Sequence, residues 1–304
     1  MGEGGGALIN KFSILKKTRQ CALKQASDLL WENVEKSLYW FDVAASSKAE
    51  TSTAKIKVQY YHCRSTLVSL HTAFSGTIIE LEDSDIKNIL QYGAARRVSA
   101  IYRNAMKICN IAYLDRVEPL SQDESGYLSD SLLVIYVHIV GVMDAFAIAL
   151  KRIAGDDLTT AEKNADILSA KFRKSVDFVS LEALFRDNSD WFLRVKDCLR
   201  NRFVHRVPPY VAPAIFTPED AVEDQRLQNT LSQALIDEDW SKLDDVPAMQ
   251  AKLGKFFPFI SFIDSDEHMP LLPTLLDDLL RFQVLTLTVL EELIPRLAFR
   301  ESQS

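Results

Sequence analysis

Glycine and proline are scarce in this chain, at 10 residues each out of 304, and most of them are clustered. Because these two residues punctuate helices, their scarcity leaves long uninterrupted stretches rich in Leu, Ala, Lys and Glu. The sequence also lacks alternating apolar and polar runs bounded by turn dipeptides, which are typical of strands. It therefore predicts an all-α fold, a multi-helix bundle.

Motifs for metals and cofactors are also lacking. Four cysteines occur, but no two form a C-x-x-C pair, so we expect reduced thiols in the core and no zinc site. No pair of histidines has metal-site spacing with a supporting carboxylate, and no glycine-rich phosphate loop or G-x-S-x-G elbow is present. We expect neither a metal nor a cofactor.

An excess of positive charge is missing as well. The net charge is -7, which argues against a surface that binds nucleic acid by general electrostatic attraction. Any contact with nucleic acid must then be local. The first residues lack the charged start and apolar middle of a signal peptide, so we expect a cytoplasmic protein.

Apolar residues recur at helical spacing over 15–45, 54–79 and 84–114, and we assign these stretches to an N-terminal helical region, 1–115. An acidic linker over 116–130 would separate it from a second domain, 127–304. The third stretch interleaves aromatic and basic residues, which is either a nucleic-acid stripe or a solvated helix face. Its members are Tyr92, Arg96, Arg97, Tyr102, Arg103 and Lys107.

The most apolar segment, 131–150, is long enough to span a bilayer, but it contains His138 and Asp144. Charged groups in hydrocarbon are costly, so a central buried helix is the better interpretation, and no membrane is expected as a partner. A carboxylate in such a helix needs a cationic or hydrogen-bonding partner. Asp144 is therefore a candidate functional residue.

The second half predicts further helices over 158–177, 187–205 and 274–297, with an irregular insertion over 210–273. Within the insertion, Pro218-Glu219-Asp220 resembles the start of a helix. The helix before the insertion should end within a residue or two of His205, because Pro208 disfavours helical geometry in the residue before it.

That helix carries Arg200, Asn201 and His205 at its end. On an ideal helix Asn201 and His205 share a face, whereas Arg200 and His205 are roughly 140° apart. The spacing resembles the R-N-x3-H signature of the HEPN superfamily, helical nucleotide- and RNA-binding domains that include metal-independent ribonucleases. The segment from Gly141 to Asp144 is similar to the glycine-then-acid helix of HEPN-like groups. The resemblance covers roughly 127–215.

The resemblance implies a metal-independent endoribonuclease of a defence or toxin-type system, with a homodimer bringing two motifs to a shared cleft. His205 would act as general base or acid, and Arg200 would hold the phosphate charge. Asn201 would position the imidazole or a phosphate oxygen, and Asp144 would fix Arg200 or the histidine tautomer. Basic neighbours that could bind RNA phosphates are Lys196, Arg202 and Arg206.

A structural interpretation stands beside this one. Asp144 and Arg200 could form a buried ion pair, and His205 could cap carbonyls at a helix C-terminus. Arg202 and Arg206 would then be surface residues. The chain would be a non-catalytic helical module that binds a nucleotide or a protein partner.

Overall fold

The structure is a computed structural model of the 304-residue chain. It describes Ile56, Leu70, Phe74 and Ile78 individually, and residues 84–301 except 114–115, 168, 177–178 and 265–267. The helices expected over 15–45 and 54–79 lie almost entirely outside the described residues. Within them the fold is mostly helical, which confirms the predicted class, with one small three-stranded sheet.

The helix predicted from residue 84 is confirmed. It consists of α4 (Ser84–Asn88), a π-helical segment η2 (Ile89–Ala95) and α5 (Arg96–Ile111), which follow one another directly. Its buried side chains recur at three- and four-residue spacing along one face: Ile86, Leu90, Ala94, Val98, Ile101, Ala105 and Ile108. Arg96, Arg103 and Lys107 are exposed on the side away from this face.

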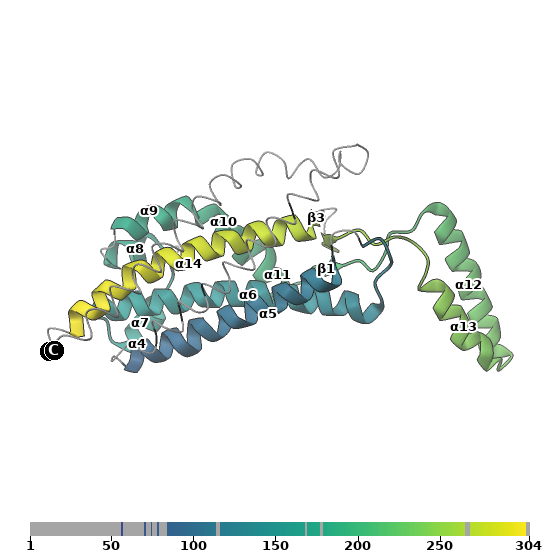
Figure 1. Ribbon diagram of the computed structural model, residues 1–304, viewed down its shortest axis with the longest axis horizontal. Helices are drawn as coiled ribbons and strands as arrows, with labels where there is room; N and C mark the ends of the chain where they lie inside the picture. Colours follow the sequence, from purple (N-terminus) through teal and green to yellow (C-terminus); the bar gives the residue numbers. More distant parts are fainter. Residues whose placement is uncertain are drawn as a thin grey trace.

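Helix α6 (Gln122–Ile153) lies at the centre of the bundle (Figure 1). It starts with a capping box in which the Ser121 hydroxyl accepts from the Glu124 N–H and the Glu124 carboxylate accepts from the Ser121 N–H. In the described part of the chain it is the one helix long and apolar enough to cross a membrane. Most of that apolar stretch is buried against η2, α5, α14 and the helix after residue 194, as expected for a core helix.

A series of short helices follows α6 where two longer ones were expected. These are α7 (Leu158–Asn164), α8 (Ala170–Val176), α9 (Val179–Asp187), α10 (Ser189–Leu193), the π-helical η3 (Arg194–Arg200) and α11 (Asn201–His205). The helix predicted over 158–177 is thus interrupted after Asn164, whereas α10, η3 and α11 run on without a break. The closing helix is α14 (Leu271–Glu301), which agrees with the prediction.

The stretch 210–273 was expected to be irregular apart from a helix start at Pro218. The helix start is confirmed, and the expectation of irregular structure is wrong. It holds strands β1 (Tyr210–Val211), β2 (Phe259–Ser261) and β3 (His268–Pro270), paired antiparallel in the order β1-β2-β3. Between β1 and β2 it forms helices α12 (Pro218–Ile236) and α13 (Trp240–Gln250). This helical pair, called the arm here, stands away from the bundle (Figure 1). The sequence did not show these elements because strands of two or three residues, and a largely polar helix such as α12, have little apolar periodicity.

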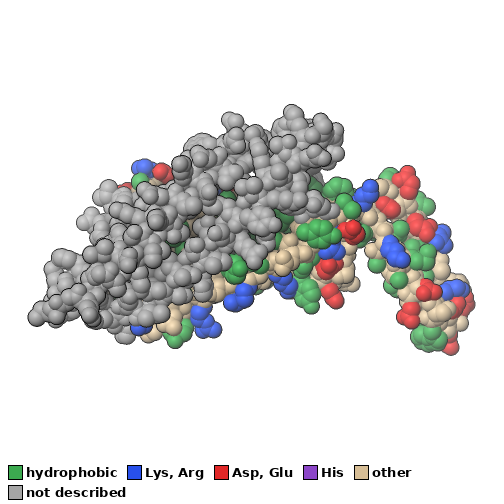
Figure 2. All heavy atoms as spheres, viewed as in Figure 1, with side chains coloured by type: hydrophobic (Ala, Val, Ile, Leu, Met, Phe, Trp, Pro, Cys, Tyr) green, Lys and Arg blue, Asp and Glu red, His purple; other side chains and the backbone are tan. Residues whose placement is uncertain are grey.

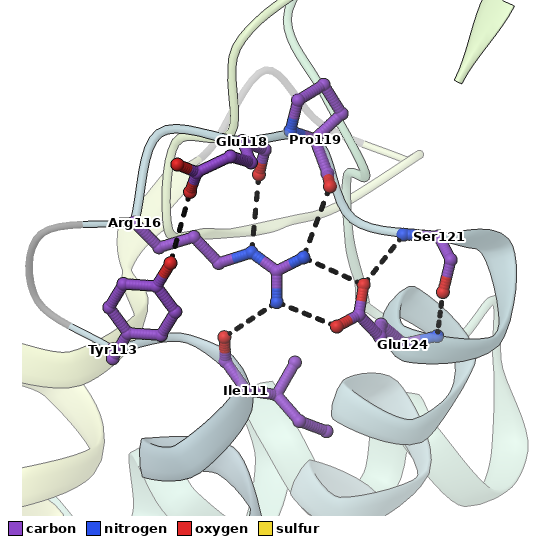
Figure 3. A network of polar contacts seen from close by, with 7 residues as sticks. All are labelled: Ile111, Tyr113, Arg116, Glu118, Pro119, Ser121 and Glu124. Carbon is purple, nitrogen blue, oxygen red and sulfur yellow. Dashed lines mark hydrogen bonds and ion pairs between the residues drawn. The ribbon is translucent and has the colours of Figure 1, made fainter. Parts of the chain in front are cut away.

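Arg116 organises the turn between α5 and α6 (Figure 3). Its guanidinium binds both carboxylate oxygens of Glu124 at 2.8 Å. It also donates to three backbone carbonyls, those of Ile111, Glu118 and Pro119. These five contacts match the five N–H groups of arginine. The stretch 116–130, expected as an acidic linker, is therefore a short fixed turn followed by the first turns of α6.

The same turn anchors the base of the arm. The Leu120 N–H donates to the Pro213 carbonyl at 2.9 Å, and the Phe256 N–H donates to the Val117 carbonyl at 2.9 Å. Ile215 and Lys255 form a two-way backbone bridge, which closes the stem of the arm. Gly254 completes this stem with a positive φ of 79°, and a β-carbon added there would fall 2.6 Å from Phe216 Cδ1 and 2.9 Å from the Ile215 carbonyl oxygen. A side chain there would be strained and would also clash.

Asp278 is a fully buried carboxylate on α14 that joins three helices. It accepts hydrogen bonds from the Tyr136 hydroxyl and the Trp191 indole N–H, each at 2.9 Å, and from the Arg194 guanidinium. Burial raises the pKa of Asp278, while Arg194 and the other two donors act in the opposite direction. The cluster ties α6, α10 and η3 to α14.

We expect Asp278→Ala to lower the free energy of unfolding by about 3 kcal/mol, because it leaves three donors without their shared acceptor. Asp277→Ala is the matched control, since Asp277 is partly exposed and binds Arg281 one turn away, and it should cost less than about 0.5 kcal/mol. Urea unfolding of the two variants measures the difference. Equal losses would contradict a special role for the Asp278 cluster.

A pH dependence follows from the turn before α6. Hydrogen bonds from Arg116 lower the pKa of Glu124 from 4.5 to about 2, so its ionised form stabilises the fold. This contribution is complete above pH 4.5 and is lost as the pH falls towards 2. We expect Glu124→Gln to be less stable than the wild type by about 1 to 3 kcal/mol at pH 6.

The gap between the two proteins should close as the pH is lowered from 5 towards 2, which denaturant titrations at several pH values will measure. Asp123→Asn removes a neighbouring first-turn carboxylate that does not bind Arg116, and it serves as the control. A gap for Glu124→Gln that stays constant down to pH 2 would be inconsistent with this account.

Candidate functional site

The R-N-x3-H motif lies where η3 passes into α11. One face of this helix packs into the core through Val195, Leu199 and Phe203. The Phe203 ring stacks on Tyr136 with ring centroids 6.3 Å apart. The helix ends at His205, and Arg206 is already extended, so the predicted end is confirmed. The motif is consequently displayed on the outer face of a firmly packed helix.

Arg200 is oriented by its neighbour. Its Nη1 donates to the Asn201 side-chain oxygen at 2.8 Å, and the Asn201 amide nitrogen donates to Asp197 at 2.9 Å. The amide of Asn201 is thus engaged on both sides. Asn201 positions Arg200 in this arrangement and does not contact His205.

His205 is exposed at the end of α11. Within the described ranges, no hydrogen bond or ion pair joins it to Arg200, Asn201 or Asp144. It is also not packed under the loop that follows, so the imidazole is open to solvent. The structure brings Arg200 and Asn201 together and leaves His205 apart from them.

Asp144 lies on the outer side of α6 and faces three cations. Partial desolvation raises its pKa even though the side chain retains solvent exposure. The charges of Lys196, Arg200 and Arg97 act to lower that pKa, whereas the charge of Asp166 acts to raise it. None of the three forms an ion pair with it within 4.0 Å. The buried Asp144–Arg200 pair weighed from the sequence is therefore not formed.

Arg97 lies directly over Gly141, one turn before Asp144. A β-carbon at position 141 would fall 2.3 Å from Arg97 Nη1 and 2.7 Å from its Cζ, so any larger residue would displace the guanidinium. His138 is on the same side of α6, and its pKa is lowered by desolvation and by the charges of Arg97 and Arg103. Gly141 therefore makes room for a cation beside Asp144.

The other predicted basic residues differ in their surroundings. Arg202 lies 3.4 Å from Asp264 and over the Phe262 ring at 4.6 Å, so it ties α11 to the residues after β2. Lys196 is half-buried near Asp144, and Arg206 is exposed. Only Lys196 of these three shares the surroundings of Asp144.

We define the Asp144 cluster as Arg97, Gly141, Asp144, Lys196 and Arg200. It carries three cations and one carboxylate, and Asp166 is a second carboxylate whose charge acts on Asp144. The positive charges remain in excess, which suits an anionic ligand such as a phosphate group. Arg97 belonged to the aromatic and basic stripe in the sequence, but nothing there linked it to Asp144, because the pairing of α5 with α6 is a tertiary contact. Asp197 and Asp278 were likewise missed, since neither has a sequence signal that distinguishes it from other carboxylates.

The two cysteines in the described part of the chain are free thiols. Burial raises the pKa of Cys109 to about 12, which keeps it protonated, while Cys198 is exposed on η3 rather than in the core as expected. Among the described residues, no group of three or more His, Cys, Asp or Glu side chains is arranged to hold a metal ion.

Comparison of the chain with protein-family models, with curated proteins and with solved structures returned no match. The interpretation of the site rests on its own geometry and on the motif.

The geometry around Asp144 leads to a stability prediction. Because Asp144 is solvent-exposed and forms no close ion pair, Asp144→Asn should change the free energy of unfolding by less than about 1 kcal/mol. Asp278→Asn, at the buried cluster, is the contrasting variant and should be clearly destabilising. If urea unfolding shows that Asp144→Asn lowers the free energy of unfolding by much more than this, a structural ion pair between Asp144 and Arg200 would be the better interpretation.

Proposed function

We propose that this chain binds RNA through the Asp144 cluster and cleaves it without a metal ion, with His205 as general base or acid. The observation that carries the proposal is the group of three cations, Arg97, Lys196 and Arg200, around one carboxylate with which none is paired. Among the residues that the structure describes, none of the three cations forms a close ion pair, so their charges are available to phosphate oxygens. The assignment to the HEPN superfamily, and with it a defence or toxin setting, is part of the proposal and rests on the R-N-x3-H motif.

The chemistry would use the ribose itself as the nucleophile. His205 would remove the proton of a 2′-hydroxyl, whose oxygen then attacks the adjacent phosphorus and displaces the 5′-oxygen of the next nucleotide. The products are a 2′,3′-cyclic phosphate and a 5′-hydroxyl. Arg200, held by Asn201 and Asp197, would stabilise the charge that develops on the phosphate oxygens.

The displaced 5′-oxygen needs a proton, which a second histidine would donate as general acid. A homodimer would divide these two tasks, with His205 of the partner subunit as the acid. This division explains why a single histidine per chain is sufficient. The proposal therefore includes a homodimer.

The experiment is an RNA cleavage assay in EDTA with the wild type, His205→Ala and the control His268→Ala. His268 is also an exposed histidine, but it lies on β3 next to Ser261, away from the motif. We expect cleavage by the wild type and by the control, and a loss of about 10² to 10⁴ in rate for His205→Ala. An oligonucleotide with a single 2′-deoxy position at the cleaved bond should be resistant.

Unchanged cleavage by His205→Ala would sink the catalytic assignment. Cleavage that disappears in EDTA would contradict the metal-independent mechanism.

A second candidate is a non-catalytic module that binds RNA or a nucleotide, and the engagement of Asn201 supports it. Because the Asn201 amide is held by Arg200 and Asp197, it is not free to orient an imidazole. The motif would then serve to present Arg200 to a phosphate. In this case no variant cleaves RNA.

Binding of 2′-O-methyl RNA, which this chemistry cannot cleave, separates the two candidates. Arg200→Gln should weaken binding under both, and it should reduce the salt dependence of the affinity by about one phosphate contact. Arg186→Gln, an exposed arginine on α9, is the control. If Arg200→Gln and Arg186→Gln bind this RNA with equal affinity, the Asp144 cluster is not the binding site.

A further inference from the structure

The arm differs from the rest of the chain in charge. Residues 218–250 contain nine acidic and two basic residues, a net charge of -7, which equals the net charge of the whole protein. The remainder of the chain is therefore neutral overall. An acidic projection of this kind favours a basic partner surface.

The tip of the arm is apolar. The turn between α12 and α13 is flanked by Leu235, Ile236 and Trp240. The exposed fractions of these side chains are 60%, 75% and 72%, respectively. The inner sides of the two helices pack on each other through Leu227, Ala234 and Val246. The tip residues are thus left over after the arm has formed its own small core. Exposed large apolar side chains grouped in this way mark an interaction site.

A surface with the opposite charge lies on the bundle. From residue 86 to 113 the chain contains five basic residues and no acidic one. Exposed members of this stretch form a basic stripe on α5 and η2, consisting of Tyr92, Arg96, Arg103 and Lys107. Lys107 lies over the exposed ring of Tyr127 on α6 at 4.0 Å, which adds aromatic surface at one end.

The arm of a given chain stands away from its own basic stripe. Figure 1 shows α12 and α13 projecting from one end of the bundle, whereas α5 runs along it. Figure 2 shows Lys and Arg side chains along the region of α5, and acidic and apolar side chains on the arm. The stripe and α12 are similar in length, at about 24 Å and about 28 Å from the helical rise of 1.5 Å per residue.

We infer that the arm of one copy docks on the basic stripe of a second copy, with the apolar tip against exposed tyrosine surface. Every copy carries both surfaces, so two copies can exchange arms around a two-fold axis. The inference goes beyond the RNA site and holds whether or not His205 cleaves RNA. It assigns the basic stripe, to which Arg97 does not belong, to protein association rather than to nucleic acid.

Charge reversal in the full chain tests the inference. One variant reverses two exposed carboxylates of α13, Asp244→Lys and Asp245→Lys, and the other reverses two stripe cations, Arg96→Glu and Arg103→Glu. We expect each to raise the dimer dissociation constant roughly tenfold or more at low salt, measured by sedimentation. Lys163→Glu with Lys171→Glu changes the same amount of charge on α7 and α8 and should leave the constant unchanged.

Complementation distinguishes lost docking from lost folding. An equal mixture of the two reversed proteins lets the substituted, locally basic segment of α13 in one protein meet the reversed stripe of the other. The unsubstituted arm meets the unsubstituted stripe in the same dimer, so dimers should return. A chain that carries all four substitutions should dimerise with itself for the same reason. Double substitution of Ile236→Ser and Trp240→Ser should weaken all of these dimers.

A wild type that stays monomeric up to about 100 μM at low salt would overturn the inference, since electrostatic pairing is strongest there. So would a mixture that fails to restore dimers. If stripe reversal instead abolishes RNA binding without altering the oligomeric state, the stripe belongs to nucleic acid. If the protein forms dimers but does not cleave RNA, only the proposed function is contradicted and the docking of the arm is not.

Discussion

The burial of α6 is the constraint on which the rest of the bundle depends. Its central segment is apolar on almost every side, and such a helix must be surrounded by others. The α4–η2–α5 rod covers one side, η3 another, and α14 a third. The outer strip that remains carries Gly141, which Arg97 covers, and the exposed Asp144. The candidate site therefore lies on the part of α6 that the apolar core does not cover.

Polar contacts fix how the covering helices are arranged around α6. Hydrophobic burial supplies most of the stabilisation but has little directional preference. Asp278 adds direction, because its carboxylate must meet donors from α6, α10 and η3 at the same point. Arg116 does the same at the other end of the connection from α5 to α6. Each is a charged group whose full set of partners exists in one arrangement only.

Helical periodicity predicted the long elements well. Examples are the α4–η2–α5 rod, α6, the end of α11 and α14. It failed where structure depends on contacts distant in sequence. The strands are too short to show alternation, and α12 and α13 are stabilised by each other. The Asp144 cluster shows the same limit for a site. The sequence marked Asp144 and Arg200, but it could not show that Arg97 lies on Gly141 or that Asn201 turns towards Asp197.

The stem of the arm has an evolutionary consequence. Because Ile215 and Lys255 are bridged by two backbone hydrogen bonds, the two ends of the intervening segment meet within a single pair of residues. For the bundle, the constraint that this segment imposes is the same as that of a short hairpin turn, because its two ends lie next to each other. Length and sequence between these residues can therefore change with little strain on the core, and Gly254 is the position in the stem where such change is least tolerated. The projection could diverge quickly between related proteins while the helices around α6 stay the same.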